Sequence, residues 1–73
     1  MPKLYSARQI VKALQRIGFE IVSQKGSYIK LKGTFGRETY TAIVPNHKEV
    51  ALGTLQSILK QAGITRDELE ENI

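Results

Sequence analysis

The alternation of apolar and polar positions is clearest over residues 25–32, which read Lys-Gly-Ser-Tyr-Ile-Lys-Leu-Lys. Side chains alternate between the two faces of a strand, so Tyr28, Lys30 and Lys32 should share one face, with the apolar residues between them directed to a core. An aromatic ring beside lysines suits a polyanion. An ordinary amphipathic strand with a basic solvated face has the same pattern, and the alternation does not decide between the two.

The amino-terminal part has helical periodicity. Ser6 and Gln9 form a capping box, which predicts a helix that begins at Ala7. Apolar residues at positions 10, 11, 14 and 17 make one stripe, and Gly18 stands where a residue of positive φ would end the helix. Basic residues recur every four positions on another side: Arg8, Lys12 and Arg16. They predict either a basic ridge for a nucleic-acid backbone or a merely solvated face.

Three runs rich in β-branched and aromatic residues follow, and each predicts a strand: Phe19–Gln24, Tyr28–Lys32 and Thr39–Val44. The glycine-bounded segment Gly33–Glu38 should form a hairpin loop with Phe35 and Arg37 exposed. Pro45 should end the third strand because it cannot donate a ladder hydrogen bond. These features predict an antiparallel meander whose one face is covered by the first helix.

The carboxy-terminal part predicts two more helices. The first runs from about Gly53 to Gln61 and is ended by Gly63, with a buried stripe of Leu52, Leu55, Ile58, Leu59 and Ala62. Thr65 and Glu68 form a second capping box, and Leu69 and Ile73 should dock the short helix that it starts. The predicted fold class is α+β, with the order α-β-β-β-α(-α), in a single domain over residues 1–73.

The charge balance of the chain limits the classes of partner that it is expected to bind. The chain has 73 residues with 11 basic and 7 acidic side chains, but four of the acids follow Thr65. The segment Met1–Thr65 holds ten basic residues against three acidic ones, a net charge of +7. Such a balance favours nucleic acid or an acidic protein over a neutral small molecule.

Other features of the composition exclude classes of site. The chain has no cysteine and one histidine, His47, so a zinc site of protein ligands is not expected and we predict no cofactor. The first six residues lack the long apolar run of a signal peptide. We therefore expect a soluble cytoplasmic protein without membrane association.

Several separate motifs occur together in this order: the helix Ser6–Gly18, Gln24-Lys25-Gly26-Ser27, Val44-Pro45-Asn46-His47, and Gly53–Gly63. In this arrangement the chain resembles HicA-type (YcfA-like) toxins. The resemblance implies a fold like that of double-stranded-RNA-binding domains and activity as a metal-independent mRNA interferase, an endoribonuclease. It also implies that the protein is the toxin of a bacterial type II toxin–antitoxin system, silenced by a HicB-type antitoxin.

One position departs from the family. The Lys-Gly-Ser turn of these toxins is normally followed by a catalytic histidine, where this chain has Tyr28. Imidazole, with a pKa of about 6.5, serves as acid and base near neutral pH, whereas a phenol with a pKa of about 10 does so poorly. Loss of such a group costs about 10²- to 10⁴-fold in rate, so we expect an inactive or weakened enzyme.

The resemblance also assigns the surrounding residues. Tyr28 would occupy the catalytic position with Ser27 in support. The residues expected to bind RNA are Lys25, Lys30, Lys32, Arg8, Lys12 and Arg16. Whether Tyr28 is natural or an engineered inactivating substitution stays open, as does any role for His47.

Two alternatives stay open beside the interferase. One is a non-catalytic RNA-binding module, and the other is a protein that docks an antitoxin and binds RNA negligibly. A helix-turn-helix DNA reader is disfavoured, because the middle of the chain is rich in strands. The sequence does not specify the RNA preference, the oligomeric state or the antitoxin.

Overall fold

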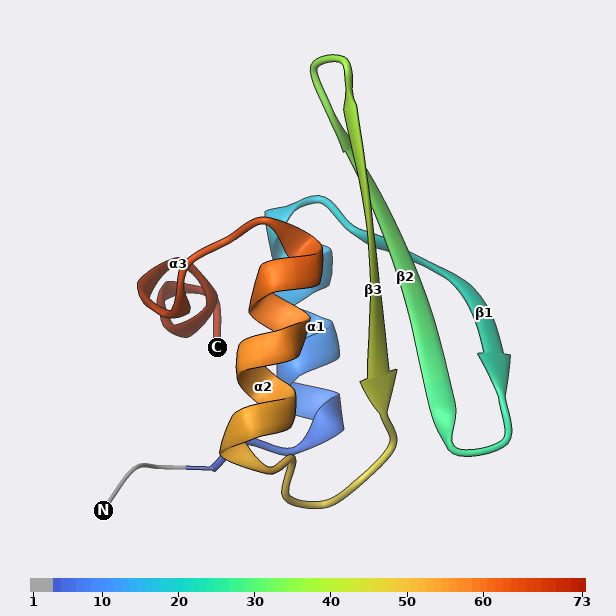
Figure 1. Cartoon of the computed structure of the whole chain (residues 1–73), viewed down its shortest axis with the longest axis vertical. Coiled ribbons are helices and arrows are strands. Elements are labelled where there is room, and N and C mark those ends of the chain that lie inside the picture. Colours follow the sequence, from blue (N-terminus) through green and yellow to red (C-terminus); the bar gives the residue numbers. More distant parts are fainter. Residues whose placement is uncertain (1–3) are drawn as a thin grey trace.

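The computed structural model describes residues 4–73. The domain predicted over residues 1–73 and the predicted lack of a signal peptide both include residues 1–3, which lie outside the described residues. The elements follow one another along the chain (Figure 1): α1 (Ala7–Ile17), β1 (Glu20–Lys25), β2 (Tyr28–Phe35), β3 (Glu38–Pro45), α2 (Leu52–Ala62) and α3 (Arg66–Glu71). The predicted α+β order is therefore confirmed.

The three strands form an antiparallel meander in the order β1-β2-β3. Pairing of β2 with β3 runs from Tyr28 opposite Pro45 to Phe35 opposite Glu38. The predicted loop Gly33–Glu38 was thus too long, since the strands pair as far as a turn that contains Gly36 at φ 62°. The hairpin of β2 and β3 projects well beyond the helices (Figure 1).

Phe35 explains why the strands extend into the predicted loop. Its ring lies 5.4 Å from that of Phe19 and 6.4 Å from that of Tyr40, centroid to centroid. A Cβ on Gly33 would come within 3.0 Å of both phenylalanine rings, so the two rings cover the strand at this glycine. Phe35 still keeps 38% of its surface exposed, which confirms the prediction of an exposed side chain.

The first strand begins at Glu20, one residue later than predicted, and Phe19 before it belongs to the core. Its side chain is 2% exposed, whereas all six residues of β1 are exposed. Ile21 and Val22 keep 42% and 49% of their surface accessible. The pairing of β1 with β2 shifts register between Ile21 and Ser23, which makes Val22 the extra residue of a bulge.

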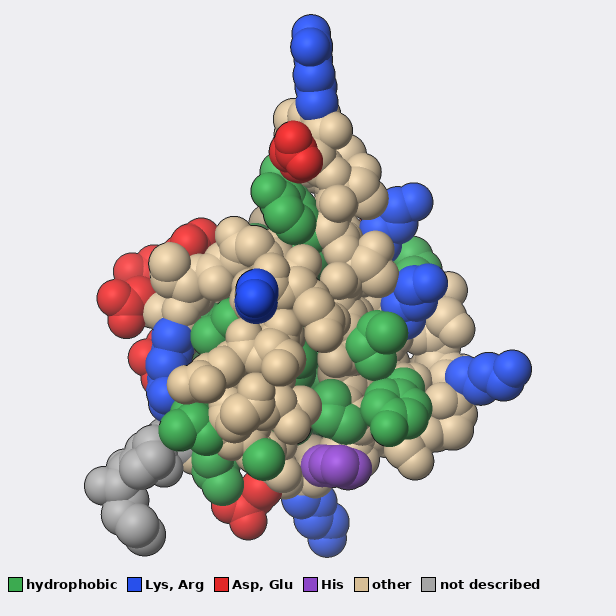
Figure 2. All heavy atoms as spheres, in the orientation of Figure 1, with side chains coloured by type: hydrophobic (Ala, Val, Ile, Leu, Met, Phe, Trp, Pro, Cys, Tyr) green, Lys and Arg blue, Asp and Glu red, His purple; other side chains and the backbone are tan. Residues whose placement is uncertain are grey.

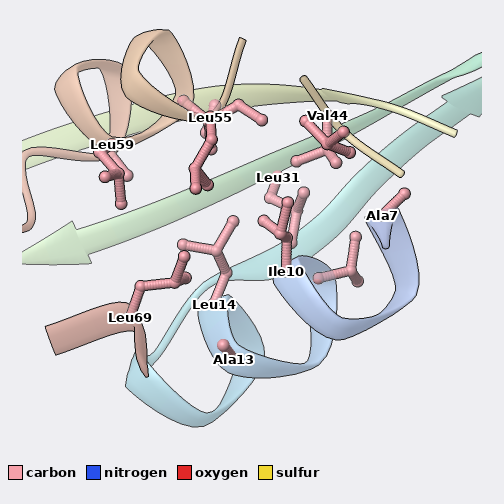
Figure 3. Close-up of a cluster of buried hydrophobic side chains, with 14 of the residues drawn as sticks. Ala7, Ile10, Ala13, Leu14, Leu31, Val44, Leu55, Leu59 and Leu69 are labelled. Carbon is pink, nitrogen blue, oxygen red and sulfur yellow. The ribbon is translucent and has the colours of Figure 1, made fainter. Parts of the chain in front are cut away.

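The core lies between the sheet and two helices on one of its faces (Figures 1 and 3). From the sheet, Leu31 and Val44 are fully buried. They face Ile10 and Leu14 of α1 and Leu55 of α2, as Figure 3 shows. The alternation in β2, exposed at 28, 30 and 32 and buried at 29 and 31, confirms the predicted faces of this strand.

The predicted helix ends are confirmed. Ser6 and Gln9 form the capping box of α1, and Gly18 ends this helix with φ 131°. Gly63 ends α2 in the left-handed conformation, at φ 69° and ψ 30°. Thr65 and Glu68 form the capping box of α3.

The short helix α3 closes the open end of the core. Leu69 is fully buried, but Ile73 is 39% exposed, so the prediction that both residues dock the helix was wrong for Ile73. The guanidinium of Arg16 donates a hydrogen bond of 2.8 Å to the carbonyl oxygen of Asn72. Within residues 4–73, no helix is both long and apolar enough to cross a membrane.

Candidate functional site

Tyr28 stands at the first position of β2, directly after the turn through Gly26, which has φ 59°. Its register partners are Lys25 in β1 and Pro45 in β3. The helices cover the opposite face of the sheet, which leaves the tyrosine 59% exposed. An aromatic side chain of this size is therefore held at the surface by a fixed strand.

A hollow of about 400 Å³ surrounds this side chain on the open face of the sheet. Its lining comes from all three strands: Ser23, Lys25, Tyr28, Lys30 and Ile43. Lys30 lies opposite Ser23 on one side and Ile43 on the other, so the register alone brings these residues together. Lys25 lies opposite Tyr28, and Lys30 lies opposite the 44% exposed Ile43, so each lysine borders the apolar surface that Tyr28 and Ile43 make.

The chemistry of the hollow is that of an apolar surface with cations beside it. An aromatic ring offers a stacking surface to a planar base, and an ammonium group donates to phosphate oxygens. None of the lining residues is acidic. Across residues 4–73, no group of three or more His, Cys, Asp and Glu side chains is arranged to hold a metal ion.

Two of the predicted site residues lie beside the hollow but do not line it. Lys32 shares the face of Lys30, but it is paired with Glu20 and Thr41 and lines a neighbouring hollow of about 470 Å³. Ser27 lies in the β1–β2 turn, and its carbonyl oxygen accepts a hydrogen bond of 2.6 Å from the N–H of Asn46. This bond ties the turn to the loop after β3.

The structure separates the predicted basic ridge from Tyr28. Arg8, Lys12 and Arg16 are exposed on α1, which packs on the other face of the sheet. The contact of Arg16 with Asn72 joins the end of this ridge to α3. The six basic residues predicted to bind RNA therefore form two surfaces.

Sequence reasoning missed Ser23 and Ile43 in the hollow. The alternation of β3 could have placed Ile43 on the open face, but its pairing with Lys30 depends on the register, which the sequence does not specify. Ser23 reaches this face because the bulge at Val22 shifts the alternation of β1 by one residue.

Charges are unevenly distributed over the surface. Figure 2 shows lysine and arginine side chains spaced along the side where β1 and β2 lie, with hydrophobic side chains and a histidine between and below them. Acidic side chains gather on the opposite side, over α3. The surface that contains the hollow therefore attracts anions more than the side over α3 does.

One ionisable group far from the hollow has a clearly shifted pKa. The phenol of Tyr5 donates a hydrogen bond of 2.5 Å to the carboxylate of Glu70. This bond raises the pKa of Tyr5 above its ordinary value, with desolvation adding in the same direction. The group belongs to the contact between α3 and the amino-terminal segment, and it has no part in the chemistry of the hollow.

Together these features define a small α+β domain with a basic, partly aromatic open sheet face. Residues 7–64 match the model of the HicA toxin family, the toxins of bacterial toxin–antitoxin systems. The match spans most of the chain, and the protein belongs to this family. A search among curated proteins found no match.

Proposed function

We propose that this toxin is an RNA-binding mRNA interferase on a double-stranded-RNA-binding-like fold, in which Tyr28 occupies the acid–base position. The observation that supports this most directly is the hollow on the open sheet face, which Tyr28 lines together with Lys25 and Lys30. A scissile phosphate in this hollow would be held by the lysines, which also stabilise its developing negative charge. Ser27 at the adjoining turn supports the phosphate.

The identity of residue 28 sets the expected activity. Metal-free RNA cleavage needs a base for the 2′-hydroxyl proton and an acid for the leaving oxygen. A phenol serves poorly as a base near neutral pH, where an imidazole serves well, so a tyrosine at position 28 contributes little to proton transfer. It can still donate a hydrogen bond and stack, so the chain keeps RNA binding and loses most of the cleavage.

Replacement of this residue tests the assignment. Tyr28→His should restore cleavage of a mixed-sequence RNA by about 10²-fold or more over the parent chain. Ile43→His is the matched control, because it places an imidazole in the same hollow on the neighbouring strand and should not restore cleavage. If the folded Tyr28→His protein binds RNA but cleaves no faster than the control, the acid–base position is wrongly assigned.

We infer that the partner antitoxin, of the HicB type, covers the same face. Tyr28 and Ile43 together expose apolar surface beside lysines, and an acidic partner with apolar side chains would complement both. A HicB-type antitoxin should therefore compete with RNA. Simultaneous binding of RNA and antitoxin would contradict a shared face. Antitoxin binding without measurable RNA binding would favour the alternative in which the basic surface serves the antitoxin alone.

A further inference from the structure

A second group of basic side chains lies outside the proposed site, where the loop between β3 and α2 meets the start of α1. A hollow of about 490 Å³ opens there, between the loop and the start of α1. Its lining residues are Ser6, Arg8, Asn46, His47 and Lys48. Three of the five carry basic side chains, and none is acidic.

Backbone hydrogen bonds fix this loop on both sides. The N–H of His47 donates to the carbonyl oxygen of Pro45 at 2.8 Å, and its own carbonyl accepts from the N–H of Ala7 at 2.9 Å. Further along, the N–H of Val50 donates to the carbonyl of Tyr5, also at 2.8 Å. The loop therefore presents its side chains from a fixed backbone, which lowers the entropic cost of binding a ligand.

No acidic side chain within residues 4–73 is paired with the basic side chains of this hollow. Among the described residues, the side chains of Arg8, His47 and Lys48 have no hydrogen-bond or ion-pair partner. Arg8 also lies in the first turn of α1, where the helix dipole favours anions, and this turn has no acidic residue. The first turn of α3, by contrast, carries two acidic residues, Asp67 and Glu68.

The hollow lies next to the proposed site. Asn46, one of its lining residues, is bonded to Ser27, and Pro45 is paired with Tyr28. The two residues from Pro45 to His47 span at most about 7 Å. On its other side, Arg8 begins the exposed basic row that continues to Lys12 on α1. The hollow thus joins the two basic surfaces that the sheet separates.

We propose that this hollow is a phosphate subsite for RNA. In this subsite Arg8, His47 and Lys48 bind a backbone phosphate of an RNA strand, and the neighbouring nucleotide of that strand lies at Tyr28. The RNA leaves the open sheet face here and continues along α1. The proposal rests on the proposed function, because it extends the RNA path that begins at the Tyr28 hollow. It assigns binding roles to His47 and Lys48.

Affinity measurements on the folded chain test this subsite. The probe is a labelled, mixed-sequence single-stranded RNA of about ten nucleotides, long enough to cross both hollows. Lys48→Ala should weaken binding several-fold at low salt and lower the slope of log K against log salt by about 0.7, the value for one phosphate of a single strand. His47→Ala should weaken binding of the same RNA. Lys60→Ala is the matched control, because Lys60 lies in the last turn of α2, away from the loop. It should leave affinity and slope unchanged.

A shorter probe separates this proposal from the proposed function. A dinucleotide that reaches only the Tyr28 hollow should lose affinity in Lys30→Ala but not in Lys48→Ala.

The longer RNA decides between the two proposals. If Lys30→Ala weakens its binding while the double variant His47→Ala with Lys48→Ala does not, the subsite is overturned and the proposed function stands. If neither variant changes RNA binding, both fail. If the double variant loses only antitoxin binding, the hollow is a protein contact and the subsite is also overturned.

Discussion

Tyr5 and Glu70 are 65 positions apart in the sequence, yet the phenol of one donates a hydrogen bond of 2.5 Å to the carboxylate of the other. The bond joins the segment before α1 to α3, and it raises the pKa of Tyr5. Because the family match ends at residue 64, this contact fastens a helix outside the matched segment to the domain.

The Tyr5 contact predicts a loss of stability in alkali. A pKa that is higher in the folded than in the unfolded chain contributes stability that is fully present below pH 10, the ordinary pKa of Tyr5, and is lost as pH rises through the folded value. Urea unfolding measured between neutral and alkaline pH should show this loss, and Tyr5→Phe should remove that part of it. An equal pH dependence in both proteins would mean that the bond contributes nothing.

The role of α3 in the core is tested by a pair of truncations. Leu69→Ala removes a fully buried side chain and should lower the free energy of unfolding by about 2–5 kcal/mol. Ile73→Ala removes an exposed one and should change it by less than about 0.5 kcal/mol. Chemical denaturation gives both values, and similar small losses would show that α3 is not part of the folded core.

Replacement by alanine should change the stability in opposite directions at Gly53 within α2 and at Gly63, which ends this helix. Gly63 has φ 69°, and a Cβ there would approach the Tyr40 ring to 2.7 Å, so Gly63→Ala should destabilise by more than about 1 kcal/mol. Gly53 is helical with open space around it, so Gly53→Ala should stabilise by about 0.5 kcal/mol. Thermal unfolding distinguishes the two signs, and the same sign for both would refute the local explanation.

Arg16 and Lys12 differ in role although the sequence spacing makes them equivalent. Arg16→Ala removes the bond to the Asn72 carbonyl and should cost about 0.5–1 kcal/mol of stability. Lys12→Ala removes an exposed cation, so it should leave stability unchanged and weaken RNA binding at low salt. Unfolding and RNA titrations on both variants provide the comparison, and a stability loss limited to Lys12→Ala would reverse the assignment.

The parts of the fold that local chemistry determines could be predicted from the sequence. The helix ends at Ser6, Gly63 and Thr65 follow from caps within a few residues of each other, and the faces of β2 follow from its alternation. The composition of the hollow could not be predicted in full, because the bulge at Val22 and the pairing of Ile43 with Lys30 depend on contacts between strands.

The same limit applies to the ridge on α1. Its spacing of four residues predicted that the three side chains share one side of the helix. It did not predict that this side lies apart from Tyr28, because the face of the sheet on which a helix packs is a property of the whole core. Arg16 meets Asn72 only because Leu69 is buried and positions α3 beside α1. Such long-range contacts leave no local pattern in the sequence.

The two edges of the sheet are unequal, and this has a consequence for the dynamics of the site. At the edge strand β3, the N–H of Ile43 donates to the side-chain oxygen of Gln61 in α2 at 3.0 Å, whereas β1 has β2 as its one neighbour in the sheet and exposes all six residues. Amide hydrogens of β1 should therefore exchange sooner than those of β2 and β3, through local opening that leaves the core intact. Such an opening carries Lys25 away from Lys30. A ligand that bridges these strands would slow that exchange, so occupancy of the hollow can be read from β1 alone.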